Sequence, residues 1–203
     1  MDISSILIGF AIVIVALTIH EAAHAWTADR LGDPTARQLG RVSLNPLVHI
    51  DPIGTVLLPL IAAVTGAPLL GWAKPVPVDI RRLRHHRRDF MIIAAAGPIS
   101  NVLQACVLAG LYRTFYPVEA VDLVPAILKF AVQINLSLAF FNLIPVPPLD
   151  GGNVLAGLVP ESAARVLDQM RQFGFIALYA LMLSGILDRL ITPPTLYFYS
   201  LLL

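Results

Sequence analysis

Apolar and polar positions divide this chain into long hydrophobic stretches separated by short polar segments. Three stretches, at 3–28, 90–115 and 124–143, are long enough as helices to cross ~30 Å of hydrocarbon at ~1.5 Å per residue. A shorter stretch at 173–187 is the predicted last span. A cleaved signal peptide is the alternative for the first stretch, but no lysine or arginine precedes it. The pattern predicts an all-α membrane protein, a polytopic helical bundle.

A further apolar stretch at 53–64 is too short to span comfortably, and Pro59 interrupts it. Because basic residues flank it on both sides, we predict that residues 40–78 form a re-entrant, partly extended element after the first span, with short extended segments at 41–44 and 75–78. Such backbone survives at membrane depth only where protein shields it or it lines a wet cavity. A full crossing is the rival interpretation, and it would place six positive charges outside.

The distribution of positive charge predicts the direction of the spans. Of the fourteen Lys and Arg residues, three follow the first span, six precede residue 90 and two precede the last span. The positive-inside rule places these segments in the cytoplasm and the N-terminus outside. An amphipathic segment at 161–171 leads into the last span, and the apolar tail at 195–203 is predicted to lie at the membrane interface.

The composition supports the membrane class. Hydrophobic residues make up 57% and charged residues 13% of the 203 residues, whereas a soluble domain carries about 25% charged residues. This balance excludes a disordered chain and almost any soluble enzyme. The net charge of +1 offers no basic excess to bind nucleic acid. The single cysteine, Cys106, excludes an intrachain disulfide and a zinc ribbon.

The sharpest motif for chemistry is His-Glu-Ala-Ala-His at 20–24. Residues four apart face the same side of a helix, so His20 and His24 can bind one zinc ion at ~2.0–2.1 Å. Glu21 lies ~100° around the helix from His20 and would reach a water rather than the metal. The alternative is three polar residues at the wet end of a helix. Glu21, however, lies ~26 Å into the crossing, where ionisable groups are rare and usually functional.

A hydrolytic zinc site needs a third protein ligand. Asp150 follows the span at 124–143, and the charge argument places it at the same depth as the two histidines. A helix N-cap is the ordinary interpretation of this aspartate, but the matching depth favours a ligand. His49, in the re-entrant region, is a weaker alternative. His85 and His86 lie in an arginine-rich segment that is most simply a solvated loop.

Three prolines within 145–148 end the preceding helix and leave extended backbone at membrane depth. An extended edge there can pair with a substrate unwound into a strand. Asn142 either donates to the scissile carbonyl and its oxyanion or merely caps the freed backbone, and the sequence favours neither role. In the middle span, the small residues at 94–97 predict close helix packing, and Asn101 is predicted to be structural.

Together these motifs resemble the site-2 protease family of intramembrane zinc metalloproteases. The resemblance covers about residues 5–160 and rests on three motifs, namely His-Glu-Ala-Ala-His at 20–24, Ala-Gly-Pro-Ile-Ser-Asn at 96–101 and Asn-Leu-Ile-Pro-Val-Pro-Pro-Leu-Asp-Gly-Gly at 142–152. The segment at 40–54 is similar to the compact prokaryotic branch, which has no PDZ or nucleotide-binding accessory domain.

The resemblance implies one zinc ion per chain, held by His20, His24 and Asp150, with Glu21 as the catalytic base. It implies that Asn142 helps to hold the substrate carbonyl, and that the substrate is a transmembrane helix of another membrane protein. A single domain over 1–203 is then expected. Its three-helix catalytic core would lie at about 3–160, followed by the amphipathic segment and last span at about 161–203.

A second function class is a metal-binding or metal-transporting membrane protein without protease activity, because intramembrane His and Asp also mark ion pathways. Inverted repeats or further polar residues along the spans would favour transport, and neither is evident. The leading prediction is therefore an intramembrane zinc endopeptidase. We expect it in the cell membrane, in contact with the lipid bilayer, with its active site toward the cytoplasmic side.

Overall fold

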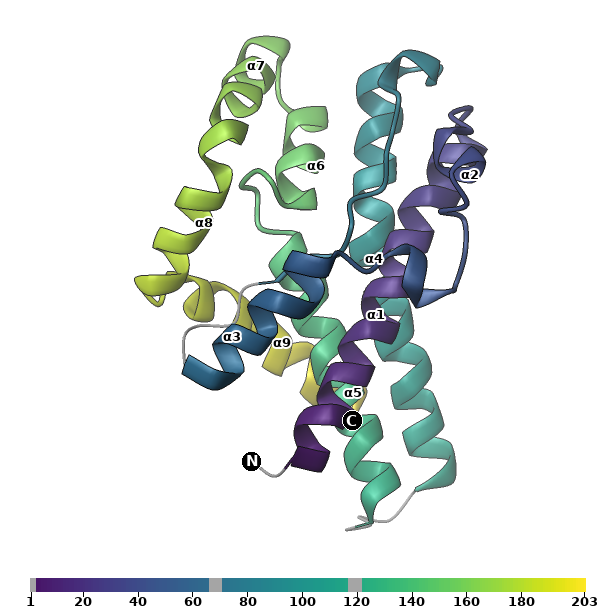
Figure 1. The fold of residues 1–203 in the computed structure, drawn as a ribbon, viewed down its shortest axis with the longest axis vertical. Coiled ribbons are helices and arrows are strands. Elements are labelled where there is room, and N and C mark those ends of the chain that lie inside the picture. The colour runs from purple at the N-terminus through teal and green to yellow at the C-terminus, as the bar shows by residue number, and fades with distance from the viewer. Residues whose placement is uncertain (1–2, 66–70, 117–121) are drawn as a thin grey trace.

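The computed structural model describes residues 3–65, 71–116 and 122–203, and these residues form helices and loops with no β-strand (Figure 1). The helices are α1 (Ile3–Arg30), α2 (Thr35–Gln38), α3 (Leu58–Thr65), α4 (His86–Phe115), α5 (Leu123–Asn142), α6 (Asp150–Leu158), α7 (Glu161–Met170), α8 (Gly174–Leu183) and α9 (Ile186–Leu202). Short turns of other helix types are η1 (Pro46–Val48), η2 (Pro52–Leu57), η3 (Ile80–Arg82) and η4 (Arg171–Phe173). The all-α prediction is confirmed.

The three predicted long spans are confirmed as α1, α4 and α5, which run along the long axis of the molecule (Figure 1). Helix α4 packs against both α1 and α5. Small buried residues such as Ala94, Gly97, Ala105 and Ala109 let its neighbours approach closely. Only 17% of the most apolar stretch of α1, and 33% of those of α4 and α5, is buried within the chain. The remaining apolar surface suits a lipid environment, so this is an integral membrane protein.

The C-terminal region differs from the prediction in one respect. The predicted last span at 173–187 is a helix only as far as Leu183, because Gly185 adopts a left-handed conformation with φ 71°. The helical segments on its two sides meet at 75°. The tail at 195–203, predicted to lie at the membrane interface, belongs for the most part to the second half of α9. There Tyr199 and Leu202 pack against the buried cluster between α4 and α5.

The predicted re-entrant element returns to the place where it began. Lys74 N donates to His49 O at 2.8 Å, and Trp72 N donates to Gly54 O at 3.2 Å, so the outgoing and returning segments lie together. In the sequence, helix α3 lies between these two segments, and it runs obliquely to the long helices (Figure 1). Residues 66–70 of this element lie outside the described residues. The segments predicted to be extended, 41–44 and 75–78, are non-helical and join no strand.

A buried carboxylate fastens the end of this element to the bundle. Asp33 is fully buried, and its Oδ2 accepts a hydrogen bond from Asp79 N at 2.7 Å while its Oδ1 accepts from Thr35 N at 3.0 Å. Because Asp33→Ala would leave these amides unpaired, we expect it to lower the free energy of unfolding by about 1–3 kcal/mol. Thermal unfolding in detergent would measure this. Asp122→Ala removes an exposed carboxylate that makes no capping bond, and should change stability by less than about 0.5 kcal/mol. Equal stability of the two variants would contradict this role of Asp33.

Candidate metal centre

Helix α1 presents two imidazoles on one buried face. His20 and His24 are 3% and 7% exposed, and their Nε2 atoms lie 3.0 Å apart. The rings meet edge to face, with centroids 4.6 Å apart. The i, i+4 spacing predicted this shared face. The Nε2 atoms of His20 and His24 therefore point at the same small volume.

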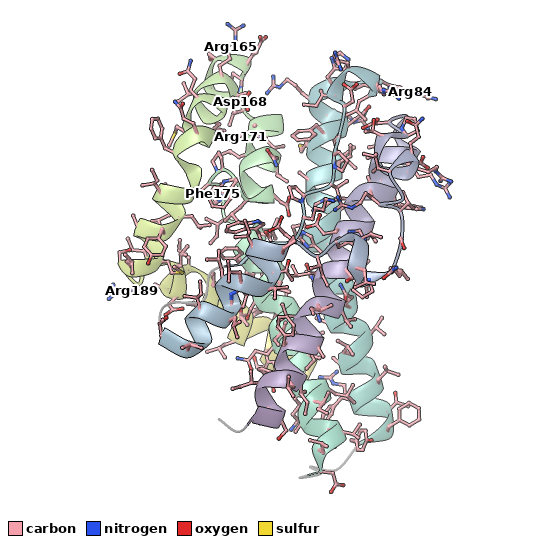
Figure 2. The ribbon with its side chains drawn as sticks, in the orientation of Figure 1. Arg84, Arg165, Asp168, Arg171, Phe175 and Arg189 are labelled. Carbon is pink, nitrogen blue, oxygen red and sulfur yellow. The ribbon has the colours of Figure 1, made fainter. Side chains whose placement is uncertain are left out.

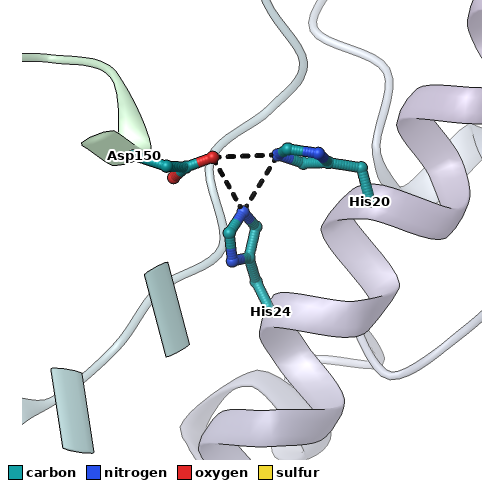
Figure 3. Close-up of side chains that lie close together, drawn as sticks. All are labelled: His20, His24 and Asp150. Atoms are coloured by element: carbon teal, nitrogen blue, oxygen red, sulfur yellow. Dashed lines mark hydrogen bonds and ion pairs between the residues drawn. The ribbon is translucent and has the colours of Figure 1, made fainter. Parts of the chain in front are cut away.

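Asp150 completes the group from the first residue of α6 (Figure 3). Its Oδ2 lies 3.1 Å from His20 Nε2 and 3.4 Å from His24 Nε2. The N-cap of α6 is Leu149, and Asp150 makes no capping bond, so the ordinary interpretation of this aspartate does not apply. The structure thus brings together the two histidines and the aspartate that the sequence singled out.

The backbone before α6 explains how Asp150 reaches this position. Helix α5 ends at Asn142, and the proline-rich segment that follows folds back beneath α6. The two glycines after Asp150 lie against that segment. A Cβ on Gly151 would overlap the carbonyl oxygens of Leu143 and Ile144, and a Cβ on Gly152 would lie 2.7 Å from Pro147 N. Only glycine permits so close an approach, so the Asp-Gly-Gly sequence sets the position of the carboxylate.

The geometry of the three ligand atoms fits a zinc ion. Ligands ~2.0–2.1 Å from one tetrahedral ion lie about 3.3–3.4 Å apart, and the observed separations are 3.0, 3.1 and 3.4 Å. Two imidazoles and one carboxylate would supply three protein ligands, the number typical of hydrolytic zinc sites, whereas structural sites use four. Across residues 3–65, 71–116 and 122–203, this is the one group of three or more His, Cys, Asp or Glu residues close enough to share a metal ion.

The other histidines lie outside this group. The Nε2 of His49 donates to Ser43 O at 2.8 Å, so this alternative ligand is engaged elsewhere. His85 and His86 are exposed at the start of α4, as predicted for a solvated segment.

Helix α4 holds both imidazoles from behind. His20 Nδ1 lies 2.6 Å from Asn101 Oδ1, and His24 Nδ1 lies 2.7 Å from the main-chain oxygen of Ile93. The same helix presents Gly97, where a Cβ would overlap the Nε2 atoms of both histidines. From the sequence we expected close packing of this face and a structural hydrogen bond from Asn101 to another helix, without identifying the histidines as its neighbours. The four-residue spacing of Gly97 and Asn101 was the signal that both face one partner.

Glu21, next to the first histidine, is half-buried. Among the described residues its carboxylate has no hydrogen-bond partner, and its electrostatic neighbours include Arg41 and His49. Burial lowers the pKa of His49 below its ordinary value, so this ring is neutral near pH 7.

Asn142, the last residue of α5, lies apart from these contacts. Its Nδ2 donates to the main-chain oxygen of Leu138 at 3.0 Å, which is the backbone-capping arrangement considered from the sequence. Because an amide NH2 carries two hydrogens, one remains for a further acceptor. The capping bond is therefore compatible with a second role.

The metal centre lies toward the arginine-rich end of the bundle. Arg84, Arg165 and Arg171 gather at this end, whereas Arg189 lies well away from it (Figure 2). At the same end Arg87 donates to the main-chain oxygens of Ala156 and Val159 and joins α4 to the end of α6. This arrangement agrees with the charge-based grouping of these segments on one side of the membrane.

Comparison with known proteins assigns the family. A protein of Bacillus subtilis named "Putative zinc metalloprotease YwhC" is 35% identical over 186 residues, which cover 89% of this chain and 82% of the relative. The chain belongs to peptidase family M50, the site-2 protease family. The M50 family model matches residues 118–185, a region that contains Asp150. The resemblance drawn from the sequence motifs is confirmed.

Other M50-type relatives agree. "Putative zinc metalloprotease Rip2" of Mycolicibacterium smegmatis is 32% identical over 178 residues, covering 87% of this chain and 66% of the relative. "Putative zinc metalloprotease MJ0611" of Methanocaldococcus jannaschii is 46% identical over 63 residues, 31% of each chain. No solved structure matches the chain significantly. These relatives are named as zinc metalloproteases. The two imidazoles and one carboxylate of this site are ligand types that zinc prefers.

Proposed function

We propose that the protein is an intramembrane zinc endopeptidase in which His20, His24 and Asp150 hold one zinc ion. The observation that carries the proposal is the convergence of these three ligand atoms, all within 4.8 Å of one another, inside a bundle of membrane helices. Membership of family M50 supports the same activity. A donor set of three protein ligands would leave room for a water on a bound ion, which is typical of hydrolytic rather than structural zinc sites.

The residues of the chain have separate roles in this reaction. A zinc ion bound here supplies a Lewis acid, which makes water a nucleophile at neutral pH and polarises a carbonyl. Glu21, whose carboxylate makes no hydrogen bond among the described residues, accepts the proton of the attacking water and then gives it to the departing amine. Asn142 uses its second amide hydrogen to hold the carbonyl of the scissile bond. His20 and His24 would hold the metal ion from α1, and Asp150 would hold it from the start of α6.

The substrate is a transmembrane segment of another membrane protein. The proposal rests on depth, because His20 follows Ile3 by seventeen residues and lies ~26 Å along an apolar helix. A peptide that reaches this site comes from within or beside the hydrocarbon layer. The arginine-rich end near the site supports a location toward the cytoplasmic side of the cell membrane, because positively charged segments favour that side.

Metal removal tests the activity. Purified protein in detergent is incubated with a labelled single-span membrane peptide, before and after dialysis against a chelator, and zinc content is measured in parallel. We expect cleavage to disappear with the zinc and to return when one equivalent of zinc is added. Cleavage by protein proven free of zinc would overturn the proposal. Zinc flux into liposomes without cleavage would favour the transport alternative instead.

A further inference from the structure

A chain of buried amides lies behind the first histidine of the metal centre. Asn101 of α4 and Asn135 of α5 are 0% and 2% exposed, and both lie within the membrane-spanning part of the bundle. Asn101 Oδ1 lies 2.6 Å from His20 Nδ1, and Asn101 Nδ2 donates to Asn135 Oδ1 at 3.0 Å. Two amides that the proposed peptidase reaction does not use thus join α4 and α5 to His20 on α1.

We propose that Asn101 is a positioning residue. Through this chain of amides it fixes the His20 ring in the tautomer that carries hydrogen on Nδ1 and leaves Nε2 free for the metal. The proposal rests on the proposed function in one respect, that Nε2 is the metal-binding atom.

The donor and acceptor of each hydrogen bond in this chain of amides follow from the last bond, between Asn135 and the main chain of α5. Asn135 Nδ2 donates to the main-chain oxygen of Ala131 at 2.9 Å, and a carbonyl oxygen can only accept. The Oδ1 of Asn135 therefore faces Asn101, which must present its NH2 there and its Oδ1 to the histidine. Because that oxygen also only accepts, His20 Nδ1 must carry the hydrogen. A backbone carbonyl on α5 thus sets the tautomer of a histidine on α1.

The two histidines differ in what holds them. His24 Nδ1 donates to the main-chain oxygen of Ile93, which no substitution at that position removes. His20 depends on a side chain, which can be replaced. Asn101 is therefore the position at which the orientation of one ligand can be altered while the ligand itself is retained.

Water does not replace the amide easily. Asn101 is fully buried, and its remaining neighbour, the main-chain oxygen of Ala16, is an acceptor at 3.5 Å. A substitution without an oxygen would leave the Nδ1 hydrogen unpaired at membrane depth, where this arrangement is costly. The ring could then rotate or adopt the other tautomer, with hydrogen on the nitrogen needed for the metal.

An ordinary role in helix packing predicts something different. Buried amides join membrane helices, and their removal lowers stability without a selective effect on a metal site. Gln104 is the matched control, because it lies one turn away on α4, is partly buried and donates to the same oxygen of Ala16 at 3.5 Å. Gln104 makes no hydrogen bond to either imidazole. It therefore has the helix-packing role of Asn101 without the contact to His20.

Three variants separate these roles. Asn101→Leu keeps the approximate volume and removes the bonds to His20 and Asn135 together with the long bond to Ala16 O. Asn101→Asp keeps an oxygen toward His20 in either protonation state, and Gln104→Leu is the control. Zinc affinity is measured by competition with a chromophoric chelator. We expect Asn101→Leu to bind zinc about 10–100-fold more weakly, and the other two to stay within about threefold of the native protein. Equal zinc affinity in Asn101→Leu and the native protein would overturn the proposal.

A measurement on the native protein keeps the test informative if Asn101→Leu does not fold. In zinc-loaded protein with ¹⁵N-labelled histidine, His20 should show a protonated Nδ1 whose hydrogen resonates downfield and exchanges slowly with water. This resonance should persist in Gln104→Leu and Asn101→Asp. Its absence from the native protein, or a metal bound through Nδ1, would refute the assignment.

Neither readout depends on proteolysis. A protein that binds zinc through His20 Nε2 but cleaves nothing would refute the proposed peptidase and leave the role of Asn101 intact. A protein that cleaves substrate, and whose zinc affinity does not respond to Asn101→Leu, would refute the positioning role and leave the peptidase intact.

Discussion

Replacing Glu21 with Gln is expected to slow cleavage about 10²–10⁴-fold while zinc remains bound. The amide keeps the size of the side chain but cannot accept the proton of the attacking water. Glu21 itself is not among the three residues that converge on the metal position, so zinc content should stay at one ion per chain. Initial rates of cleavage of a single-span peptide, with zinc measured on the same sample, would test this.

Glu161→Gln provides a matched control for that experiment. Glu161 is exposed on α7, where its carboxylate pairs with Arg165. The same chemical change there should leave the rate unaltered, because exposed pairs of this kind contribute little. Cleavage by Glu21→Gln at the native rate would remove Glu21 from the mechanism, whatever the fate of the metal site.

Gly97→Ala is expected to abolish metal binding and activity together. A Cβ at this position would overlap His24 Nε2 and lie 2.5 Å from His20 Nε2, the two atoms proposed to hold the metal. Real Cβ atoms do not approach so closely, so one imidazole must leave its place. Zinc content by elemental analysis should fall below about a tenth of an ion per chain, since a site with one imidazole displaced loses a ligand.

Gly110→Ala distinguishes this effect from a general effect of alanine in the helix. Gly110 lies on the same helix, α4, where a Cβ would meet nothing within 4 Å. Alanine there should keep zinc and activity and should stabilise the helix by about 0.5–1 kcal/mol. Full zinc occupancy in Gly97→Ala would show that the imidazoles bind metal in an arrangement different from the one described.

The local sequence pattern was sufficient to predict the long helices and to predict that the two histidines share one helix face. Apolar length set α1, α4 and α5, and the spacing of His20 and His24 follows from the helix repeat. Asp150 required an argument about depth, since 126 positions separate it from His24 in the sequence. The ligand assignment of all three remains a proposal that their observed proximity supports.

Features that depend on contacts between distant elements could not be predicted from local sequence pattern. The close approach of Gly97 to both imidazoles, and the bond from Asn101 to His20, exist only once α1 and α4 are packed. The tail was predicted to be interfacial because its apolar length is short. That prediction could not include the docking of the tail on α5, which follows from the bend at Gly185, a position whose conformation no hydrophobic pattern reveals.

The division of the metal centre between α1 and α6 has a consequence for biosynthesis. His20 and Asp150 are 130 residues apart in the chain, so a ribosome must add 130 residues after His20 before the carboxylate exists. A nascent fragment that ends earlier has two imidazoles and Glu21 but lacks a third anchor for the ion. Proteolytic activity would therefore arise only after the first helices have been inserted. Nascent membrane chains nearby would not be cleaved before that point.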